Sequence, residues 1–464
     1  MELTVGALAG IVGGEVFVGD PDGRVSSYAI DTRLLVPGAC FVALRGERDG
    51  HDFVADAFDR GAAMALVSRA PDAPHTDATL VRVVDPLAAL GALAAHARTL
   101  MTDATVVGIT GSAGKTATKD LTASALSASR RVHASPLSFN NESGLPLTIL
   151  SAPDDTEALI VEMGARFAGN ITALVEIARP QIGVITHIGM AHAEHLGGRE
   201  GIARVKGELV EALPASGLAV LNVACDASPG LAARTAARVV RVGRAPDADV
   251  VVRDVRLDDE MRARFVLETP WGRAPVALAL RGEHQVDNAA MAAVVALELG
   301  APMESVVAGL EVAVTASLRM DLVRTPSGIV VINDAYNSSP TSAAAAIRSL
   351  GHLSVPGRRI AVLGPMLELG RHAAEEHTSL GVLAAASGID ALVVVGDDVG
   401  HIAEGARGST SHGTEISVVN VPDAAAAADY LMGEVRPGDA VLVKASRAVG
   451  LEAVADALVR GVSA

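Results

Sequence analysis

Short apolar runs rich in Val and Ile recur along this chain, and stretches with helical spacing lie between them. Such runs are typical of buried parallel strands, and their alternation with helices predicts a doubly wound α/β arrangement. In the middle of the chain we expect strands over 105–109, 158–161, 182–185 and 218–221, then an antiparallel piece over 250–279. The alternation restarts near residue 317, with strands expected over 329–332, 359–363, 391–395 and 440–443.

The first part of the chain has shorter elements, with a helix expected over 55–63 and a strand over 65–67. A helix is also expected over 86–100, where proline occupies a tolerated first position. At roughly 150 residues per domain, 464 residues predict about three domains. The predicted fold class is therefore α/β, with a small α/β domain, a central phosphate-loop ATPase-type parallel sheet and a C-terminal Rossmann-like domain, over residues 1–84, 85–316 and 317–464.

The composition of the chain argues against several classes of function. Aromatic residues make up 2% of the chain and the formal net charge is -16, so neither base stacking nor attraction to phosphate backbones favours a nucleic-acid partner. Cys40 and Cys225 lie far apart, which predicts neither a disulfide frame nor a zinc site. No window reaches the roughly 20 apolar residues of a membrane span, and Glu2 stands where a signal peptide needs basic residues. We expect a soluble cytoplasmic protein.

The strongest chemical signal is a glycine-rich turn that follows the 105–109 strand. Backbone amides of such a loop can surround phosphate oxygens, Lys115 can reach the β and γ phosphates, and Thr116 offers a hydroxyl to Mg²⁺. The strict spacing asks for glycine at position 109, which is Ile109, so the match is imperfect. Gly-Lys-Thr between a strand and a helix nevertheless favours nucleotide binding over a plain turn.

Polar residues follow other predicted strands. Glu162 ends a buried strand at the sheet edge where ligands bind, so it can share Mg²⁺ with Thr116, the alternative being a salt-bridged strand end. His187, His192 and His195 follow the next strand, and their spacing fits no standard zinc motif. From the residues alone none of the three can be preferred.

Two clusters of polar residues follow predicted strands in the last part of the chain. They are 333–340, which contains Asp334, Tyr336 and Asn337, and 444–447, which contains Lys444, Ser446 and Arg447. The first suits ribose or substrate and equally suits a turn, and the second suits a carboxylate.

Taken together, these residues resemble the Mur ligase family over nearly the whole chain. The resemblance is carried by segments 31–33, 49–53, 110–116, 140–142, 162–164, 191–192, 206–208, 282–284, 334–337, 366–370 and 444–447. The Asp-Ala-Tyr-Asn and Leu-Glu-Leu-Gly stretches are similar to the branch that adds D-alanyl-D-alanine. The Asp-Asn-Pro-Arg signature of the diaminopimelate-adding branch is absent.

The resemblance implies an ATP-dependent amide ligase that activates the carboxylate of UDP-MurNAc-tripeptide as an acyl phosphate and joins it to D-Ala-D-Ala. It implies two Mg²⁺ ions and a carbamylated lysine at Lys206, a residue that would otherwise be read as a solvated helix lysine. The implied catalytic residues are Lys115, Glu162, His192 and Lys206, and the implied metal ligands are Thr116, Glu162, His192 and Lys206.

The resemblance also implies binding residues, and we expect a monomer with no membrane partner. For ATP they are Gly111, Ser112, Ala113, Gly114, Lys115, Thr116, Ala117, His284, Asn288, Arg319 and Asp334. For the UDP-linked substrate and the dipeptide they are Asp31, Thr32, Arg33, Gly50, His51, Asp52, Phe53, Asn140, Asn141, Tyr336, Asn337, Lys444, Ser446 and Arg447. Alternatives are a relative with another acceptor, such as D-alanyl-D-lactate, a folylpolyglutamate-synthetase-like ligase, or a nucleotide-gated regulator without activity.

Overall fold

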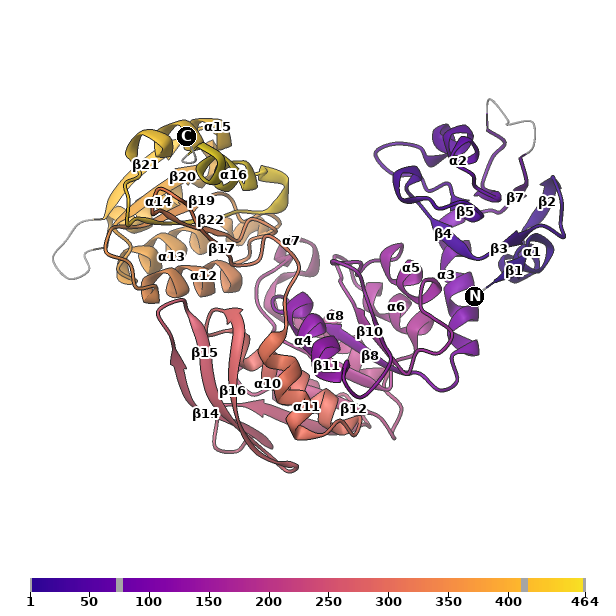
Figure 1. Ribbon diagram of the computed structural model, residues 1–464, viewed down its shortest axis with the longest axis horizontal. Coiled ribbons are helices and arrows are strands. Elements are labelled where there is room, and N and C mark those ends of the chain that lie inside the picture. The colour runs from indigo at the N-terminus through magenta and orange to yellow at the C-terminus, as the bar shows by residue number, and fades with distance from the viewer. Residues whose placement is uncertain (1, 72–77, 410–415, 462–464) are drawn as a thin grey trace.

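The computed structural model describes residues 2–71, 78–409 and 416–461 (Figure 1). Three sheets of five or more strands follow one another along the chain, and each has helices packed against it. In Figure 1 the parts that contain the first and the last sheet lie on opposite sides above the central part. Among the described residues, no helix combines the length and apolarity that a membrane crossing requires.

The first sheet has the strand order β2-β7-β6-β5-β4, in which β2 is antiparallel to β7 and the other neighbours are parallel. A short antiparallel pair, β1 with β3, lies beside it. The strands are β1 (Leu3–Thr4), β2 (Glu15–Val18), β3 (Arg24–Val25), β4 (Ser27–Ala29), β5 (Ala39–Val42), β6 (Met64–Val67) and β7 (Leu80–Arg82). The helices are α1 (Val5–Val12), η1 (Thr32–Leu34), η2 (Gly50–Phe53) and α2 (Val54–Asp59).

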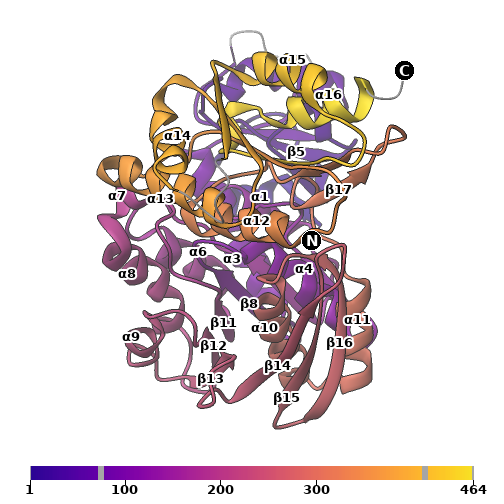
Figure 2. The same ribbon diagram turned by 90° about the vertical axis from the view of Figure 1, so that its left-hand side faces the viewer.

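The central sheet has the order β16-β15-β14-β13-β12-β11-β8-β10-β9, parallel from β9 to β14 and antiparallel from β14 to β16. Its strands are β8 (Thr105–Thr110), β9 (Val132–Ala134), β10 (Ala158–Glu162), β11 (Ile182–Ile185), β12 (Leu218–Asn222), β13 (Arg238–Gly243), β14 (Val250–Leu257), β15 (Arg262–Thr269) and β16 (Gly272–Arg281). Its helices are α3 (Pro86–Leu100), α4 (Lys115–Leu126), α5 (Gly144–Leu150), α6 (Asn170–Ala178), α7 (Ala193–Leu196), α8 (Gly198–Glu211), α9 (Ser228–Ala232), α10 (Gln285–Glu298) and α11 (Met303–Val312). Helices α4, α10 and α11 pack together beside β14–β16 (Figure 2).

The last sheet has the order β17-β18-β22-β19-β20-β21, parallel except for β17. Its strands are β17 (Asp321–Arg324), β18 (Val330–Asn333), β19 (Arg359–Leu363), β20 (Ala391–Val395), β21 (Ser417–Val421) and β22 (Ala440–Lys444). Its helices are α12 (Pro340–His352), η3 (Gly370–His372), α13 (Ala373–Ala386), η4 (Asp397–Val399), α14 (Gly400–Arg407), α15 (Ala424–Glu434), η5 (Arg447–Val449) and α16 (Glu452–Gly461). The predicted α/β fold class is confirmed, while the limits 1–84, 85–316 and 317–464 remain our proposed domain boundaries.

The apolar runs predicted the central strands of the two larger sheets, and α3 has the expected bounds. The pattern did not predict β9, β13, β17 or β21, which lie toward the sheet edges or beside the added hairpin and have fewer buried positions. The helix expected after the phosphate loop is α4, which begins at Lys115 because the loop passes directly into it.

The first and central parts share one hydrophobic core. Val5, Leu66 and Val81 of the first part belong to the same apolar cluster as Leu145 and Leu209 of the central part. The last part has two clusters of its own, and the turn between β14 and β15 adds Met261 to one of them. The joint between the first and central parts is therefore a packed core, whereas the last part adjoins the central part through a smaller contact.

We predict that Met261→Ala weakens the attachment of the last part. Met261 is 0% exposed and shares an apolar cluster with Met320 of the last part, so its truncation should cost about 2–5 kcal/mol of unfolding free energy. Calorimetry of the full chain measures this loss. Met432→Ala, at a 40% exposed position, should cost about 1 kcal/mol or less. Equal losses in the two variants would contradict the role given to Met261.

Candidate active site

The phosphate loop, Gly111–Gly114, connects the end of β8 to the start of α4. Gly111 and Gly114 have φ angles of 153° and 84°, and a Cβ atom on either would collide with Thr186 or Asn288 respectively. The loop is also tied to the segment after β11, because the Ser112 amide donates to the His187 carbonyl at 2.7 Å. These constraints explain why glycine occupies both positions. They also place the first backbone amides of α4 beside the loop.

Lys115 is the first residue of α4, and its ammonium folds back onto the loop. Its Nζ donates to the Gly111 carbonyl at 2.9 Å. Burial lowers the pKa of Lys115, the nearby Glu162 carboxylate opposes this effect and Arg319 adds to it. An arriving anion would therefore meet a desolvated cation in a loop of backbone donors.

Glu162, at the end of β10, is the carboxylate of the site. Its side chain is buried, with the whole residue 1% exposed. The Thr116 hydroxyl donates to Glu162 Oε2 at 2.8 Å, and Asn140 Nδ2 donates to Oε1 at 2.8 Å. The structure thus brings together Thr116 and Glu162, the pair that the sequence proposed for Mg²⁺. Asn141 instead lies three residues before the start of α5, and its side-chain oxygen accepts from the amide of Gly144, the first residue of that helix, at 2.9 Å.

Arg319 reaches this pair from the segment that leads into the last sheet. Its Nη2 donates to the Thr116 hydroxyl at 3.0 Å and to the Ser138 hydroxyl at 3.1 Å, and its guanidinium lies 4.2 Å from the centre of the Tyr336 ring. Among the described residues its buried Nε has no hydrogen-bond partner. A buried donor without a partner is costly, so the site has capacity for an additional acceptor.

Lys206 extends from α8 into the same region. It is 1% exposed, and no hydrogen bond to its Nζ is formed within the described parts of the chain. Burial holds the pKa of Lys206 well below its usual range, Lys115 lowers it further and Glu162 opposes them. The amine of Lys206 is thereby shifted toward its neutral, nucleophilic form.

His192 immediately precedes α7 and has a φ of 61°. Its Nδ1 contacts Glu368 Oε2 of the last part. Burial lowers the pKa of His192, Glu368 opposes this, and Lys115 and Lys206 contribute to the lowering. His195 lies instead against Phe167, with ring centres 5.2 Å apart. Of the three histidines, His192 is the one whose pKa is lowered by Lys115 and Lys206, whereas burial and Arg199 lower the pKa of His187 and Asp226 raises it.

The segment expected to contact adenine lies against the phosphate loop. Asn288 is close enough to Gly114 to exclude a Cβ there, and its Nδ2 donates to Gln285 Oε1 at 3.0 Å. His284 Nδ1 is buried with no hydrogen-bond partner in the described residues, and Asp334 and Lys444 influence its pKa, which burial lowers. Of the predicted ATP residues, Asn288 thus lies against the loop and Arg319 against Thr116, whereas His284 is influenced by Asp334 and Lys444 of the last part.

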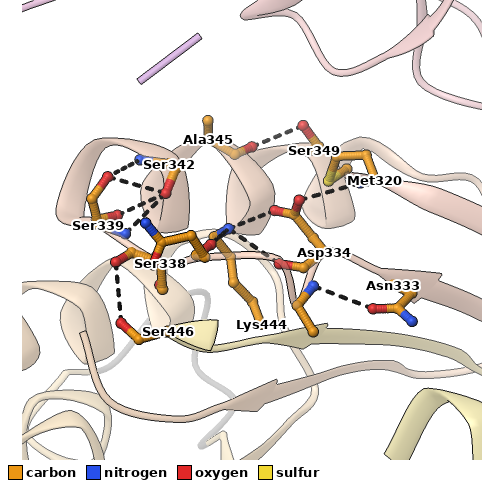
Figure 3. A network of polar contacts seen from close by, with 12 residues as sticks. Met320, Asn333, Asp334, Ser338, Ser339, Ser342, Ala345, Ser349, Lys444 and Ser446 are labelled. Carbon is orange, nitrogen blue, oxygen red and sulfur yellow. Dashed lines mark hydrogen bonds and ion pairs between the residues drawn. The ribbon is translucent and has the colours of Figure 1, made fainter. Parts of the chain in front are cut away.

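Lys444 and Ser446, two of the residues expected to bind the substrate, lie in a polar network at the carboxyl ends of β18 and β22 (Figure 3). Lys444 Nζ pairs with Asp334 Oδ2 at 2.7 Å and donates to the Asn337 carbonyl at 2.8 Å. The Ser446 hydroxyl accepts from the Leu367 amide at 2.9 Å. Arg447 is more exposed and pairs with Glu452 at 3.0 Å. Lys444 and Ser446 therefore shape the backbone here, and Lys444 must change partner before it can bind a substrate carboxylate.

The predicted UDP-binding residues form two capped turns in the first part. Asp31 caps η1 and pairs with Arg33, whose hydrogen bonds lower the Asp31 pKa to about 2. Thr32 and His51 are buried. His51 Nδ1 lies 2.6 Å from Asp49 Oδ1, and its Nε2 accepts from the Ser68 amide at 2.9 Å. Both ring nitrogens are thus occupied, so His51 holds the loop in place in this arrangement.

The remaining residues of the second turn are placed differently from one another. Gly50 is required because a Cβ there would meet the Leu44 backbone. Asp52 is exposed, and Phe53 packs against the small apolar cluster of the first part. A separate cavity of about 580 Å³ lies at the amino ends of β11 and β12, lined by Arg98, Glu176, Arg179 and Pro214. It is at the sheet edge opposite the phosphate loop and does not belong to the site.

Comparison with known proteins gives the family. Three Mur ligase descriptions match the chain: the family's catalytic domain over residues 24–98, the middle domain over 109–296 and the glutamate ligase domain over 318–447. The chain belongs to the Mur ligase family. It is 44% identical to UDP-N-acetylmuramoyl-tripeptide–D-alanyl-D-alanine ligase of Mycobacterium tuberculosis (strain ATCC 25618 / H37Rv), covering 99% of this chain and 98% of that protein.

Solved structures of Mur ligases agree with this fold. MurF from Acinetobacter baumannii has a TM-score of 0.89 at 30% identity and covers 99% of each chain. MurF ligase from Thermotoga maritima in complex with ADP has a TM-score of 0.79 at 30% identity and covers 94% of this chain and 98% of that one. The resemblance inferred from the sequence is confirmed.

Sequence reasoning missed several residues of this Mur ligase site. Ser138 links Thr116 to Arg319, and the buried Lys119 donates to the Ser135 and Leu137 carbonyls at 2.6 and 2.8 Å, which holds the loop that carries Ser138. One signal could have found Lys119. The only lysines of this chain are Lys115, Lys119, Lys206 and Lys444, and the rest of its 38 Lys and Arg residues are arginines.

We predict that Lys115→Ala lowers ATP turnover at least about 100-fold and leaves the fold intact, because it removes a preorganised donor to phosphate but only one internal hydrogen bond. Phosphate release measures turnover, and circular dichroism with thermal unfolding measures the fold. Arg256→Ala, which removes an exposed cation of β14, is the control and should keep turnover. Undiminished turnover in Lys115→Ala would refute the assignment of the loop.

Proposed function

We propose that this Mur ligase uses ATP to join D-alanyl-D-alanine to UDP-N-acetylmuramoyl-tripeptide, the step that yields the pentapeptide precursor of peptidoglycan, in the cytoplasm. One observation carries the proposal: a relative named for this reaction is 44% identical over 99% of the chain. The site supports the same chemistry, since a phosphate loop, a buried carboxylate and an arginine from the last part converge on Thr116.

The reaction has two steps. A carboxylate oxygen of the tripeptide attacks the γ-phosphorus of ATP, the bond to the β,γ-bridging oxygen breaks, and ADP leaves. The amine of the dipeptide then attacks the acyl carbon, the bond to the phosphate oxygen breaks, and the amine loses a proton. The first step brings two anions together, so its barrier depends on positive charge placed in advance.

The residues of this chain provide that charge locally. Lys115 and the amides of Gly111–Gly114 face the phosphates, and Arg319 adds a second cation from the opposite side of Thr116. Arg319 lies in the segment between the central and last sheets, so its position depends on how the last part is docked. Docking of the last part over the loop would also limit the water that can hydrolyse the acyl phosphate.

The residues present fit Mg²⁺. Among the described residues no cluster of three or more His, Cys, Asp or Glu side chains could hold a metal by itself. Mg²⁺ usually takes one or two carboxylates and completes its shell with phosphates and water, which matches Thr116 and Glu162 beside a phosphate loop. When bound there, Mg²⁺ would neutralise phosphate charge. We assign Thr116, Glu162 and His192 as its protein ligands.

We further assign Lys206 as a carbamate. Its buried amine has a pKa held well below the usual range, which favours the neutral form that reacts with carbon dioxide. The amine nitrogen bonds to the carbon of carbon dioxide, one C=O π bond opens to leave negative charge on oxygen, and the nitrogen loses a proton. That charge would be balanced by Lys115 and by a second Mg²⁺, and the carbamate would supply an anionic oxygen ligand in addition to Glu162.

The function is tested by acceptor choice. With ATP, Mg²⁺ and UDP-MurNAc-tripeptide present, we expect phosphate release to require D-Ala-D-Ala and to yield the UDP-linked pentapeptide by mass spectrometry. Glutamate and D-alanyl-D-lactate are the comparison acceptors. Release driven by glutamate alone would favour the folylpolyglutamate-type alternative, and release driven better by D-alanyl-D-lactate would favour a depsipeptide ligase.

The Lys206 carbamate is tested by chemical rescue. Lys206→Ala should lose activity and regain part of it with short-chain carboxylic acids, which restore an anionic oxygen in the vacated space. The wild-type chain incubated with ¹³C-bicarbonate should give one carbamate carbon signal, which is missing from Lys206→Ala. The other three lysines are internal controls. Full activity of Lys206→Ala without added acid would remove the carbamate from the mechanism.

A further inference from the structure

The last part touches the central part at a second polar joint, beside α7. In both views α7 lies next to the start of α13, and α7 contacts η3 (Figures 1 and 2). The central residue of this joint is Glu368. Its carboxylate contacts His192 Nδ1 through Oε2 and Arg166 Nη2 through Oε1 at 3.3 Å, and its carbonyl accepts from the Glu194 amide at 3.1 Å.

The loop that carries Glu368 is held firmly by the last part. His377 Nε2 accepts from the Met366 amide at 3.0 Å, and the Ser446 hydroxyl accepts from the Leu367 amide at 2.9 Å. Glu368 itself has a φ of 61°, a conformation that non-glycine residues rarely adopt. Strained backbone persists where surrounding contacts fix it, and such positions cluster at functional sites.

We propose that Glu368 is a positioning residue through which the docked last part orients His192 and selects its Nδ1–H tautomer, leaving Nε2 free to bind a metal ion. This inference rests on the proposed function, because it takes His192 as a ligand in that site. Glu368 would then make the geometry of the metal site depend on whether the last part is docked.

The chemistry of imidazole supports this role. Neutral histidine has one N–H and one bare nitrogen. A carboxylate beside Nδ1 accepts a hydrogen bond from Nδ1–H, so Nε2 keeps its lone pair. Without Glu368, His192 would keep no hydrogen bond to its ring among the described residues. Lys115, which also influences His192, carries no acceptor when protonated, so it cannot fix this tautomer.

Glu368 also lies in a different part of the chain from His192, the ligand that it orients. Glu162, Lys206 and His192 come from the central part, whereas Glu368 comes from the last part. Arg166 offers the carboxylate a second partner, 66% exposed, which helps dock the loop without touching the histidine. Substitution at Arg166 therefore separates weakened docking from loss of the histidine contact.

The experiment reads the tautomer directly. Long-range ¹H–¹⁵N spectra of the full chain labelled with [¹⁵N]histidine, at about pH 8.5 where ordinary histidines are neutral, distinguish Nδ1–H from Nε2–H. His192→Gln assigns the signal among the 13 histidines. We expect the Nδ1–H form in the wild type and a shift toward Nε2–H in Glu368→Ala. The kcat of Glu368→Ala should fall about 10–100-fold with little change in KM for ATP.

Three further variants make the result specific. Arg166→Gln should keep the tautomer and lose less kcat than Glu368→Ala. Glu375→Gln, an exposed position of α13, should change neither readout. Glu368→Gln keeps the length of the side chain but loses its charge, so it should give mixed tautomers and an intermediate kcat, and it serves if Glu368→Ala folds poorly.

An Nδ1–H form that persists in Glu368→Ala, or a kcat that equals that of the wild type, would overturn the inference. The two proposals can fail separately. Full activity of His192→Gln would overturn the assignment of His192 and this inference with it. An inactive His192→Gln beside a fully active Glu368→Ala would overturn only the role of Glu368.

Discussion

The buried carboxylate of Glu162 is the charge on which the rest of this site depends. The half-buried Lys115 and the buried Lys206 lie near it, and Arg319 is bonded to its partner Thr116. Arg319 disfavours the charged form of Lys115, and Lys115 disfavours the charged form of Lys206. Desolvated cations at short range repel one another strongly. Glu162 opposes that repulsion in both lysines, and nucleotide phosphates would relieve the remainder. The site is therefore held in an electrostatically unfavourable state that its substrate corrects.

This constraint explains why the first part is joined to the central part more extensively than the last part is. The first part shares an apolar core with the central part, so the distance between a held substrate and the phosphate loop is set by packing. The last part has its own cores and meets the central part through Met261, Arg319 and Glu368. Placing the half-buried Arg319 beside Lys115 is costly without substrate, whereas polar contacts can exchange partners with water at small cost. Docking of the last part can thus bring the positive charge of Arg319 to the site when the anionic substrates arrive.

Much of the fold followed from the sequence because buried parallel strands leave continuous runs of Val, Ile and Leu. Thr116 and Glu162 could be paired in advance because both follow neighbouring parallel strands, whose carboxyl ends share one edge. His192 could be selected only by resemblance, since three nearby histidines look alike in sequence. Glu368 could not be found this way, because its partner lies 176 positions away across a joint. His51 shows the converse: it is a motif residue whose ring is fully used by Asp49 of its own loop and by Ser68, which follows β6.

The distribution of lysine adds a last physical point. The four lysines of the chain lie at the site or in the loop and network that support it. Three of them are 2% exposed or less, whereas the surface cations are arginines. Guanidinium keeps its charge at any physiological pH, so it serves for surface pairs and for Arg319, whose task is to remain positive. An amine can be pushed toward its neutral form by burial and by neighbouring cations, as in Lys206. Where the chemistry requires an uncharged nitrogen, arginine cannot replace lysine, and at Lys206 this chain uses the residue whose charge its surroundings can remove.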